Sequence, residues 1–504
     1  MSESSLINRR QYSALYKILA VIVAAFGTGF MWRARGSHGF GGMFGMFSVA
    51  AFMTLLILAI FGDRKKNIYE MIPLMVFATG VTAGGWGTLN RQMAGVLDTT
   101  SVYSTLGEST YVSISPFSGM LIMLMLGFGW LPFFGFLLGR FFTDKRYKVK
   151  HLIIAALVFY SVQYILKATL AHPILELFHP QAAELFAKGL AEQGLDTNQW
   201  LMYLKHFNGM SWAKKITGGR NYFTSIEVVS KAIAAAAVML YQRFGVKDKR
   251  GSVINFCTCA IMAVSITLAD VIMLFDVPGG IFEHIKKPQW LKYTWSYWEY
   301  FTGFLLGLGV MILCFIADKK LKDNWNLADD FPTISRKLRA AYNTLTTLFF
   351  TFGLALAMPA ISRVYDQEYT LTGKKVFYSL EDYNAAIQTN PDLRAVCFKN
   401  PIPIAVTYVV VLAALLAVYA YIVHKNMIKK GLDTPIDMSP VRFAGRAYIT
   451  YFLIVAALYF FTNGAALLNP VKDSVTKTML VSFAVVILGI IGLKLSDRQV
   501  KSKA

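Results

Sequence analysis

The chain alternates long apolar runs with short polar connections. Each run is about twenty residues long, which is what a helix needs to cross about 30 Å of hydrocarbon, and none has the alternating period of a strand. Twelve runs are present, at residues 12–32, 43–61, 68–89, 117–142, 151–171, 223–243, 252–276, 298–317, 341–361, 402–423, 446–466 and 477–495. The pattern predicts an all-α integral membrane protein with about twelve transmembrane helices.

Basic residues gather in every second connection between these runs. The clusters include Arg64 to Lys66, Lys145 to Lys150, Arg243 to Arg250, Lys319 to Arg339, Lys425 to Lys430 and Arg498 to Lys503. Short cytoplasmic loops are enriched in lysine and arginine, so the alternation predicts that both termini are cytoplasmic. The net charge of +21 is therefore interpreted as topology, and no nucleic-acid partner is expected.

Composition agrees with a lipid environment, because 55% of the residues are hydrophobic and only 16% are charged. The first apolar run lacks a small-residue cleavage pattern and is expected to be retained as a span. On the other face, longer connections lie at about 90–116, 172–222 and 362–400. Within the second of them, residues 181–207 have a helical apolar period and are expected to form an amphipathic helix on the outer surface.

Similar features recur six spans apart. The second run ends ILAIFGDRKK and the eighth ends ILCFIADKK, and both following runs carry a Phe and a Gly at matching distances before Arg91 and Arg363. Duplication is common in transporter folds. The recurrence predicts two related halves of six helices each, residues 1–251 and 252–504.

The acidic and basic residues in these loops resemble the signature of the major facilitator superfamily, in which an Asp and basic residues follow helices two and eight. The matching residues are Asp63, Arg64 and Lys66, and Asp318, Lys319 and Lys320. The family's glycines beside the Asp are missing here, and the connection between spans six and seven is short. The resemblance implies two bundles that rock about a central cavity, with Asp63, Arg64, Asp318 and Lys319 in gating roles.

Ionisable residues inside spans are costly and are functional candidates by default. In this chain they gather at the outer ends of the predicted spans. The candidates for binding a substrate are Arg33, Arg35, His38, Trp86, Asn90, Arg91, Arg220, Trp298 and Glu299. The candidates for ion coupling or an internal ion pair are Glu227, Lys231, Asp270 and Asp276, and Asp98 is a further acid near Arg91.

Two of these features allow both a structural and a functional interpretation. Glu227 and Lys231 are four residues apart and are expected to pair on one helix face, which alone would explain them. Asp270 lies in the apolar run SITLADVIMLF, where burial should favour its protonated form and make it a proton carrier, unless Lys231 or a backbone amide pairs with it.

Two glycine-rich segments also have two interpretations. Residues 27–42 contain six glycines around Trp32, two arginines and His38, and are expected to break regular helix; residues 80–92 repeat the theme around Trp86. Such segments can expose amides to an anion, or they can allow tight helix packing.

The aromatic cluster Trp295, Tyr297, Trp298 and Tyr300 suggests a headgroup belt or rings that stack on a sugar. The four cysteines and the scattered histidines have no metal-ligand spacing, and no nucleotide or hydrolase motif is present. No metal or cofactor is therefore expected.

Two functions remain. The first is a secondary transporter in a bacterial inner membrane, coupled to protons or sodium, that carries an organic anion or acidic saccharide. The second is a membrane-embedded transferase or hydrolase with an outward-facing site for a lipid-linked or glycan substrate, in which Asp98, Glu227, Asp276 and Glu299 are available as bases.

Overall fold

The computed structural model describes residues 12–37, 43–61, 90–98, 111–143, 147–178, 180, 220–277, 279–291, 293–321, 388, 440–462 and 474–502. Its longer helices are α1 (Ala14–Ser37), α2 (Met43–Phe61), α5 (Pro116–Phe128), α6 (Pro132–Phe142), α7 (Val149–Thr169), α12 (Arg220–Leu240), α13 (Lys249–Asp270), α14 (Thr294–Lys320), α19 (Pro440–Thr462) and α21 (Ser474–Ser502). Shorter helices are α4 (Asn90–Met93), α8 (Ala171–Phe178), a π-helix at Tyr241–Gly245 and 3-10 turns at Val271–Asp276 and Gln289–Leu291.

Apolar helices dominate the described part of the chain. Within it, six helices are long and apolar enough to cross a membrane, or seven if the bent pair α5 and α6 forms one span. These helices indicate a multi-pass membrane protein. The expected runs at 68–89, 341–361 and 402–423, and the amphipathic helix expected at 181–207, lie outside the described residues.

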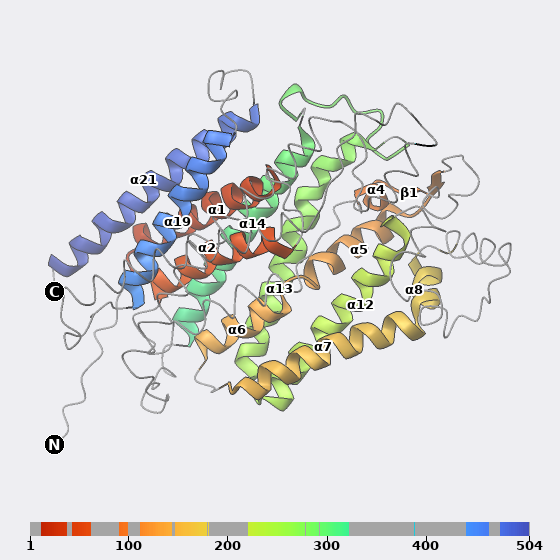
Figure 1. Cartoon of the computed structure of the whole chain (residues 1–504), viewed down its shortest axis with the longest axis horizontal. Helices are drawn as coiled ribbons and strands as arrows, with labels where there is room; N and C mark the ends of the chain where they lie inside the picture. The colour runs from red at the N-terminus through yellow and green to blue at the C-terminus, as the bar shows by residue number, and fades with distance from the viewer. Residues whose placement is uncertain are drawn as a thin grey trace.

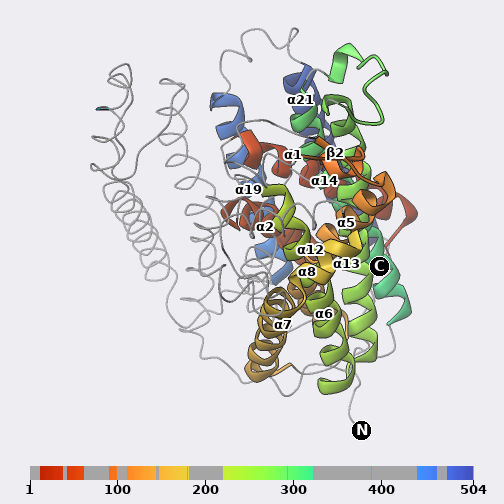
Figure 2. The same cartoon turned by 90° about the vertical axis from the view of Figure 1, so that its right-hand side faces the viewer.

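One short sheet departs from the all-α expectation. Strands β1 (Val96–Asp98) and β2 (Tyr111–Ser113) pair in antiparallel register, with Val96 opposite Ser113. Both lie in a connection that the apolar pattern left without an element, because three-residue strands are too short to give a periodic signal. The hairpin and α8 lie at the same end of the bundle (Figures 1 and 2).

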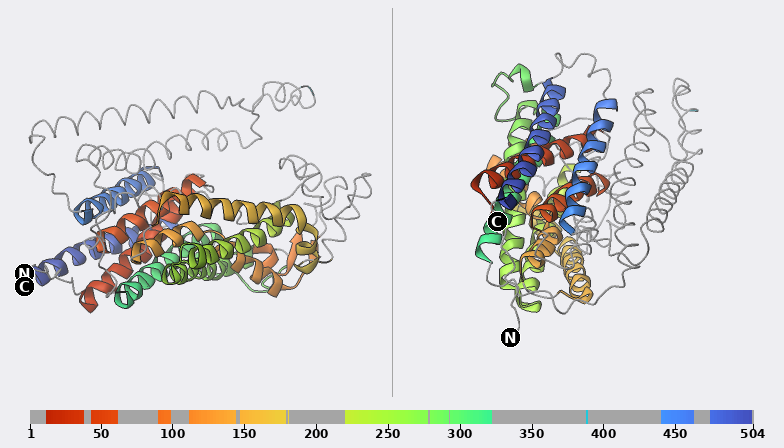
Figure 3. Two further views of the ribbon diagram at one scale, coloured as in Figure 1. Left: turned by 90° about the horizontal axis from the view of Figure 1, so that it is seen from below. Right: turned by 90° about the vertical axis from the view of Figure 1, so that its left-hand side faces the viewer.

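The described helices form a row (Figure 1). Its order is α21, α1, α14, α13, α5 with α6, α12 and α7, while α2 packs against α1 and α19. Figure 3 shows the helices lying side by side along the long axis of the molecule. Helices α13 and α14, from the expected second half of the chain, thus lie between α1 and α5–α6 from the expected first half.

Helices α1 and α14 approach closely because small residues face each other. A Cβ on Gly307 would lie 2.2 Å from the carbonyl oxygen of Ala24, and one on Gly303 would lie 2.5 Å from that of Thr28. The later glycine of α14, Gly307, meets the earlier residue of α1, Ala24, so the two helices run antiparallel. A glycine pair four residues apart is a common way to bring two membrane helices together.

Helix α13 lies antiparallel against α5 and α6 through a second series of small residues. Gly127 faces Ala263, Gly135 faces Asn255 and Gly139 faces Gly251, and a Cβ at each glycine would meet its partner at under 3.0 Å. The contacts are therefore made largely by backbone, so neither helix can rotate without separating from the other.

The span formed by α5 and α6 is broken at residues 129–131, where the two helix axes differ by 50°. Pro132 begins α6, and proline cannot donate the backbone hydrogen bond that would continue α5. A Cβ on Gly129 would contact Lys231 on α12. The break therefore lies inside the bundle, against α12.

The expectation that residues 27–42 break the helix is wrong up to Ser37, since α1 is continuous to that residue. Gly27 and Gly29 instead provide room for neighbours: a Cβ on Gly27 would overlap the ring of Phe52, and one on Gly29 would crowd Tyr300. Glycine in a membrane helix costs little when another helix packs on it.

Candidate functional site

The first cluster joins the end of α1 to the start of α14. Arg33 Nη1 lies 2.8 Å from Glu299 Oε2, and Arg35 Nη2 lies 3.9 Å from Glu299 Oε1. The Arg35 side chain is 4% exposed, that of Glu299 13% and that of Arg33 18%, so two guanidinium groups share one carboxylate that is largely removed from solvent. The close antiparallel packing of α1 and α14 brings these three residues together from distant parts of the sequence.

An aromatic stack leads from this cluster to the broken span. The Arg35 guanidinium lies 4.9 Å from the centre of the Trp32 ring, and Trp32 stacks on Trp130 with ring centroids 6.2 Å apart. Both tryptophans are buried. Trp130 is one of the break residues, so the position of the break is tied to the arginine cluster through two flat, rigid rings.

The second cluster joins α7 and α12. Lys231 Nζ lies 2.9 Å from Glu227 Oε1, so the ion pair that their spacing predicts is present. Lys167 of α7 lies 3.9 Å from the same oxygen. All three side chains are at most 23% exposed. Here too one carboxylate is shared by two cations, and the Lys231 backbone packs against the break at Gly129.

Asp270, at the end of α13, is fully buried, and neither of its carboxylate oxygens has a hydrogen-bond partner in the described part of the chain. The indole of Trp298 faces the carboxylate without meeting hydrogen-bond geometry. Thr267, one turn earlier on α13, has a buried hydroxyl that is also without a partner among the described residues. Lys231, the expected counter-ion, pairs with Glu227 instead.

Other expected site residues lie elsewhere. Asp276 is about one-third exposed in the connection after α13, where its carboxylate pairs with Lys287 at 2.5 Å and accepts a hydrogen bond from Thr294. Asp318 and Lys319 lie at the far end of α14, 19 residues and about 29 Å from Glu299. Asp318 and Lys319, the residues of α14 expected to gate, are therefore well separated from the arginine cluster at Glu299.

Several expected residues cannot be placed. Asp63, Arg64, His38 and Trp86 lie outside the described residues, as do the side chains of Asn90, Arg91, Asp98 and Arg220. The backbones of α4 and α12 are close, because the Gln92 side chain exchanges hydrogen bonds with Ser225 at 2.9 and 3.2 Å. The expected proximity of Arg33, Arg91 and Arg220 stays a prediction.

The aromatic cluster before α14 divides into two kinds of residue. Trp295 is 47% exposed, and the nearby Trp290 and Tyr293 are exposed to a similar degree. This exposure suits a belt of aromatic residues at the lipid headgroups. Tyr297, Trp298 and Tyr300 are buried, and the Tyr300 hydroxyl lies 2.5 Å from that of Ser482 on α21. The belt interpretation is wrong for these three residues, because helical spacing turns them toward α1, α13 and α21.

Sequence reasoning missed Trp130 and Lys167. Lys167 lies inside an apolar run, so the cost of burying a charge was a signal that could have found it. Trp130 had no such signal, because a tryptophan in a membrane segment is common. Its role follows only from the break and from the facing Trp32.

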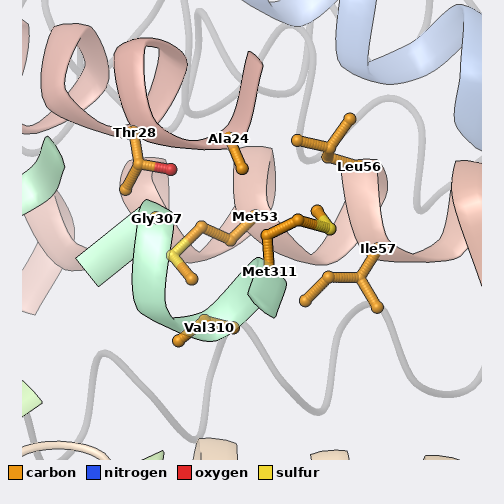
Figure 4. A pocket seen from close by; sticks show the side chains of 8 residues that line it. All are labelled: Ala24, Thr28, Met53, Leu56, Ile57, Gly307, Val310 and Met311. Carbon is orange, nitrogen blue, oxygen red and sulfur yellow. The ribbon is translucent and has the colours of Figure 1, made fainter. Parts of the chain in front are cut away.

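A small apolar cavity lies between α1, α2 and α14 (Figure 4). Its lining includes Ala24, Thr28, Met53, Leu56, Ile57, Gly307, Val310 and Met311. About 180 Å³ there is not filled by atoms, but the open core has room for only about one water molecule. In Figure 4 the Thr28 hydroxyl is the polar group among these side chains, and it has no hydrogen-bond partner in the described chain. The cavity adjoins the glycine contact between α1 and α14.

Among the described residues, no three His, Cys, Asp or Glu side chains are grouped as metal ligands would be. The comparisons with known proteins give no family: no protein-family model, no curated protein and no solved structure matches this chain.

Proposed function

We propose that this protein is a secondary active transporter of an organic anion or acidic saccharide, coupled to an ion gradient. It would cross a bacterial inner membrane twelve times with both termini in the cytoplasm. The directions of three helix pairs support this topology. Helix α1 runs antiparallel to α14, α13 runs antiparallel to α5–α6, and α14 runs parallel to α21. These are the directions that the alternating loop charges require.

Asp270 is the observation that carries the proposal. A carboxylate in apolar surroundings, with neither oxygen hydrogen-bonded by any of the described residues, is unfavourable as an ion, so the protein favours its neutral, protonated form. A purely structural acid is usually paired, as Glu227 and Glu299 are. An acid that is buried without a partner suits a role in which it takes up a proton on one side and releases it on the other.

The two charged clusters support an anionic substrate. In each, two cations surround one carboxylate: Arg33 and Arg35 around Glu299, and Lys167 and Lys231 around Glu227. A substrate carboxylate could compete for the shared cations at little cost, because guanidinium and ammonium groups bind carboxylates through charge-assisted hydrogen bonds. Both clusters are linked to the break in the α5–α6 span, the first through the Trp32 and Trp130 stack and the second through Lys231 against Gly129, so a change in the bend would alter both.

The test is uptake and counterflow in proteoliposomes with and without a pH gradient, using a panel of carboxylates and acidic sugars. Asp270→Asn should abolish gradient-driven accumulation while leaving counterflow, which needs no net proton movement. Asp276→Asn is the matched control, because Asp276 is close in sequence to Asp270 but is about one-third exposed and is paired with Lys287. Accumulation that survives Asp270→Asn would remove Asp270 from the coupling role.

An enzyme with an outward-facing site is the second candidate. It is favoured by one observation: Glu299, Glu227 and Asp270 all lie toward the same end of the bundle rather than along its whole depth. Such an enzyme should turn over a lipid-linked substrate in detergent, where no gradient exists. Turnover in detergent without uptake of any tested anion would favour the enzyme.

A further inference from the structure

A buried polar network occupies the end of the bundle opposite the arginine cluster. It begins at Asp248, which caps α13: its Oδ1 accepts a hydrogen bond from the Gly251 amide at 2.7 Å. Its Oδ2 accepts hydrogen bonds from the Thr143 hydroxyl at 2.7 Å and from the Tyr147 hydroxyl at 2.6 Å. Asp248 is 2% exposed, so this acid is buried and fully satisfied.

From Tyr147 the network continues into the bundle. The Gln242 amide donates to the Tyr147 hydroxyl at 2.7 Å and accepts from the Asn255 amide at 2.9 Å. The Cys259 thiol donates to Asn255 Oδ1 at 3.7 Å and also interacts with the backbone of Leu131. The network therefore runs from the connection between α6 and α7 to the break in the α5–α6 span.

The chemistry of its members shows what the network can do. Burial and the neighbouring Asp248 raise the pKa of Tyr147, so its hydroxyl remains a donor. Gln242 and Asn255 are amides, which bridge donors and acceptors but do not hand a proton on. The network is thus suited to holding α6, α12 and α13 together and not to conducting protons.

Small residues line this contact surface. Gly135 and Gly139 of α6 face Asn255 and Gly251 of α13, so at these two positions the helices meet without large side chains between them. Each hydrogen bond could be replaced by one to water, so each bond adds only a modest net amount to the stability of the contact. Points of bending lie on both sides: the 50° break in one span, and the π-helix Tyr241–Gly245 that carries Gln242.

We propose that the hydrogen bonds joining Asp248, Tyr147, Gln242 and Asn255 form a releasable latch that closes the cytoplasmic end of the transport path. This inference rests on the proposed transporter function. Breaking the latch should favour a state in which α6 and α13 separate and Cys259 becomes accessible. Cys259 is wholly buried in the closed state and is a native reporter of that separation.

The experiment compares two single-cysteine chains, one retaining Cys259 and the other Cys314. Both thiols are fully buried, but Cys314 lies on α14, outside the network. Labelling by N-ethylmaleimide is timed by mass spectrometry for the purified, folded protein.

Two variants weaken the latch. Asp248→Asn keeps an oxygen for the Gly251 amide but loses the second carboxylate oxygen that accepts hydrogen bonds. Tyr147→Phe removes the hydroxyl of the tyrosine. Tyr164→Phe is the matched control, because that tyrosine is 55% exposed on α7.

We expect both latch variants to label Cys259 about 5- to 30-fold faster, as the loss of one or two hydrogen bonds implies, with Cys314 and the control unchanged. Unchanged Cys259 labelling in both variants would overturn the latch. An equal increase at Cys314 would also overturn it, since the network would then support the whole fold. Labelling requires no substrate, so it tests the latch independently of transport. If Cys259 is labelled faster but no transport is found, the result counts against the proposed transporter function and not against the separation of α6 from α13.

Discussion

At the scale of single residues, burial separates the acids that resemble one another in sequence. Glu299 and Asp276 both lie near the start of α14, yet the first is enclosed with two arginines and the second is about one-third exposed beside one lysine. An ion pair that is removed from water leaves a costly unpaired charge when one partner is deleted, whereas an exposed pair contributes little. Identical chemistry should therefore give different effects at the two positions.

Glu299→Gln should lower the free energy of unfolding by about 3–5 kcal/mol, because two guanidinium groups that are largely removed from water lose the carboxylate that they share. Asp276→Asn should lower it by less than about 1 kcal/mol. Thermal unfolding of both purified variants in one detergent measures the difference. Equal shifts would mean that solvent or another acid neutralises the arginines.

At the scale of elements, glycines decide which helices meet. The apolar pattern predicts each helix, but the partners of α1 and α13 follow from where a side chain is absent. Gly445 on α19 offers the contrast, since a Cβ there would meet no atom of the described residues within 4 Å. Glycines in helices of similar hydrophobicity thus range from essential to dispensable.

Gly307→Ala should destabilise the protein by about 1–3 kcal/mol, because the added methyl overlaps the backbone of α1 and forces the helices apart. It should also loosen the contact between Arg33 and Glu299. Gly445→Ala should leave stability unchanged or raise it by up to about 1 kcal/mol through better helix propensity. Unfolding curves of the pair provide the measurement; a stable Gly307→Ala would show that α1 and α14 tolerate a wider separation.

At the scale of the whole molecule, the direction of each helix assigns its ends to opposite faces. Lys247 precedes α13 and Lys286 follows it, so the two lysines should lie on opposite sides of the membrane. The loop charges assign Lys247 and Lys429 to the cytoplasm and Gln193 and Lys375 to the outside.

Single cysteines at these five positions should therefore react with an impermeant maleimide in two groups, Lys247 with Lys429 and Lys286 with Gln193 and Lys375. Labelling of intact cells and of inverted vesicles distinguishes the groups. A cysteine at position 193 that is labelled only in inverted vesicles would contradict the twelve-span topology. A cysteine at position 286 that is labelled from the same side as one at position 247 would contradict an α13 that crosses the membrane.

The sequence by itself determined the apolar runs, because the length needed to cross hydrocarbon is a local property of the chain, and every described run is helical. It also determined the Glu227 to Lys231 ion pair, since four residues make one helical turn. The sharing of Glu299 by two arginines, the surroundings of the Asp270 carboxylate and the Trp32 and Trp130 stack came only from tertiary structure. Each depends on which helix packs on which, and that is set by contacts between residues far apart in the sequence, such as Arg33 and Glu299, which no local pattern records.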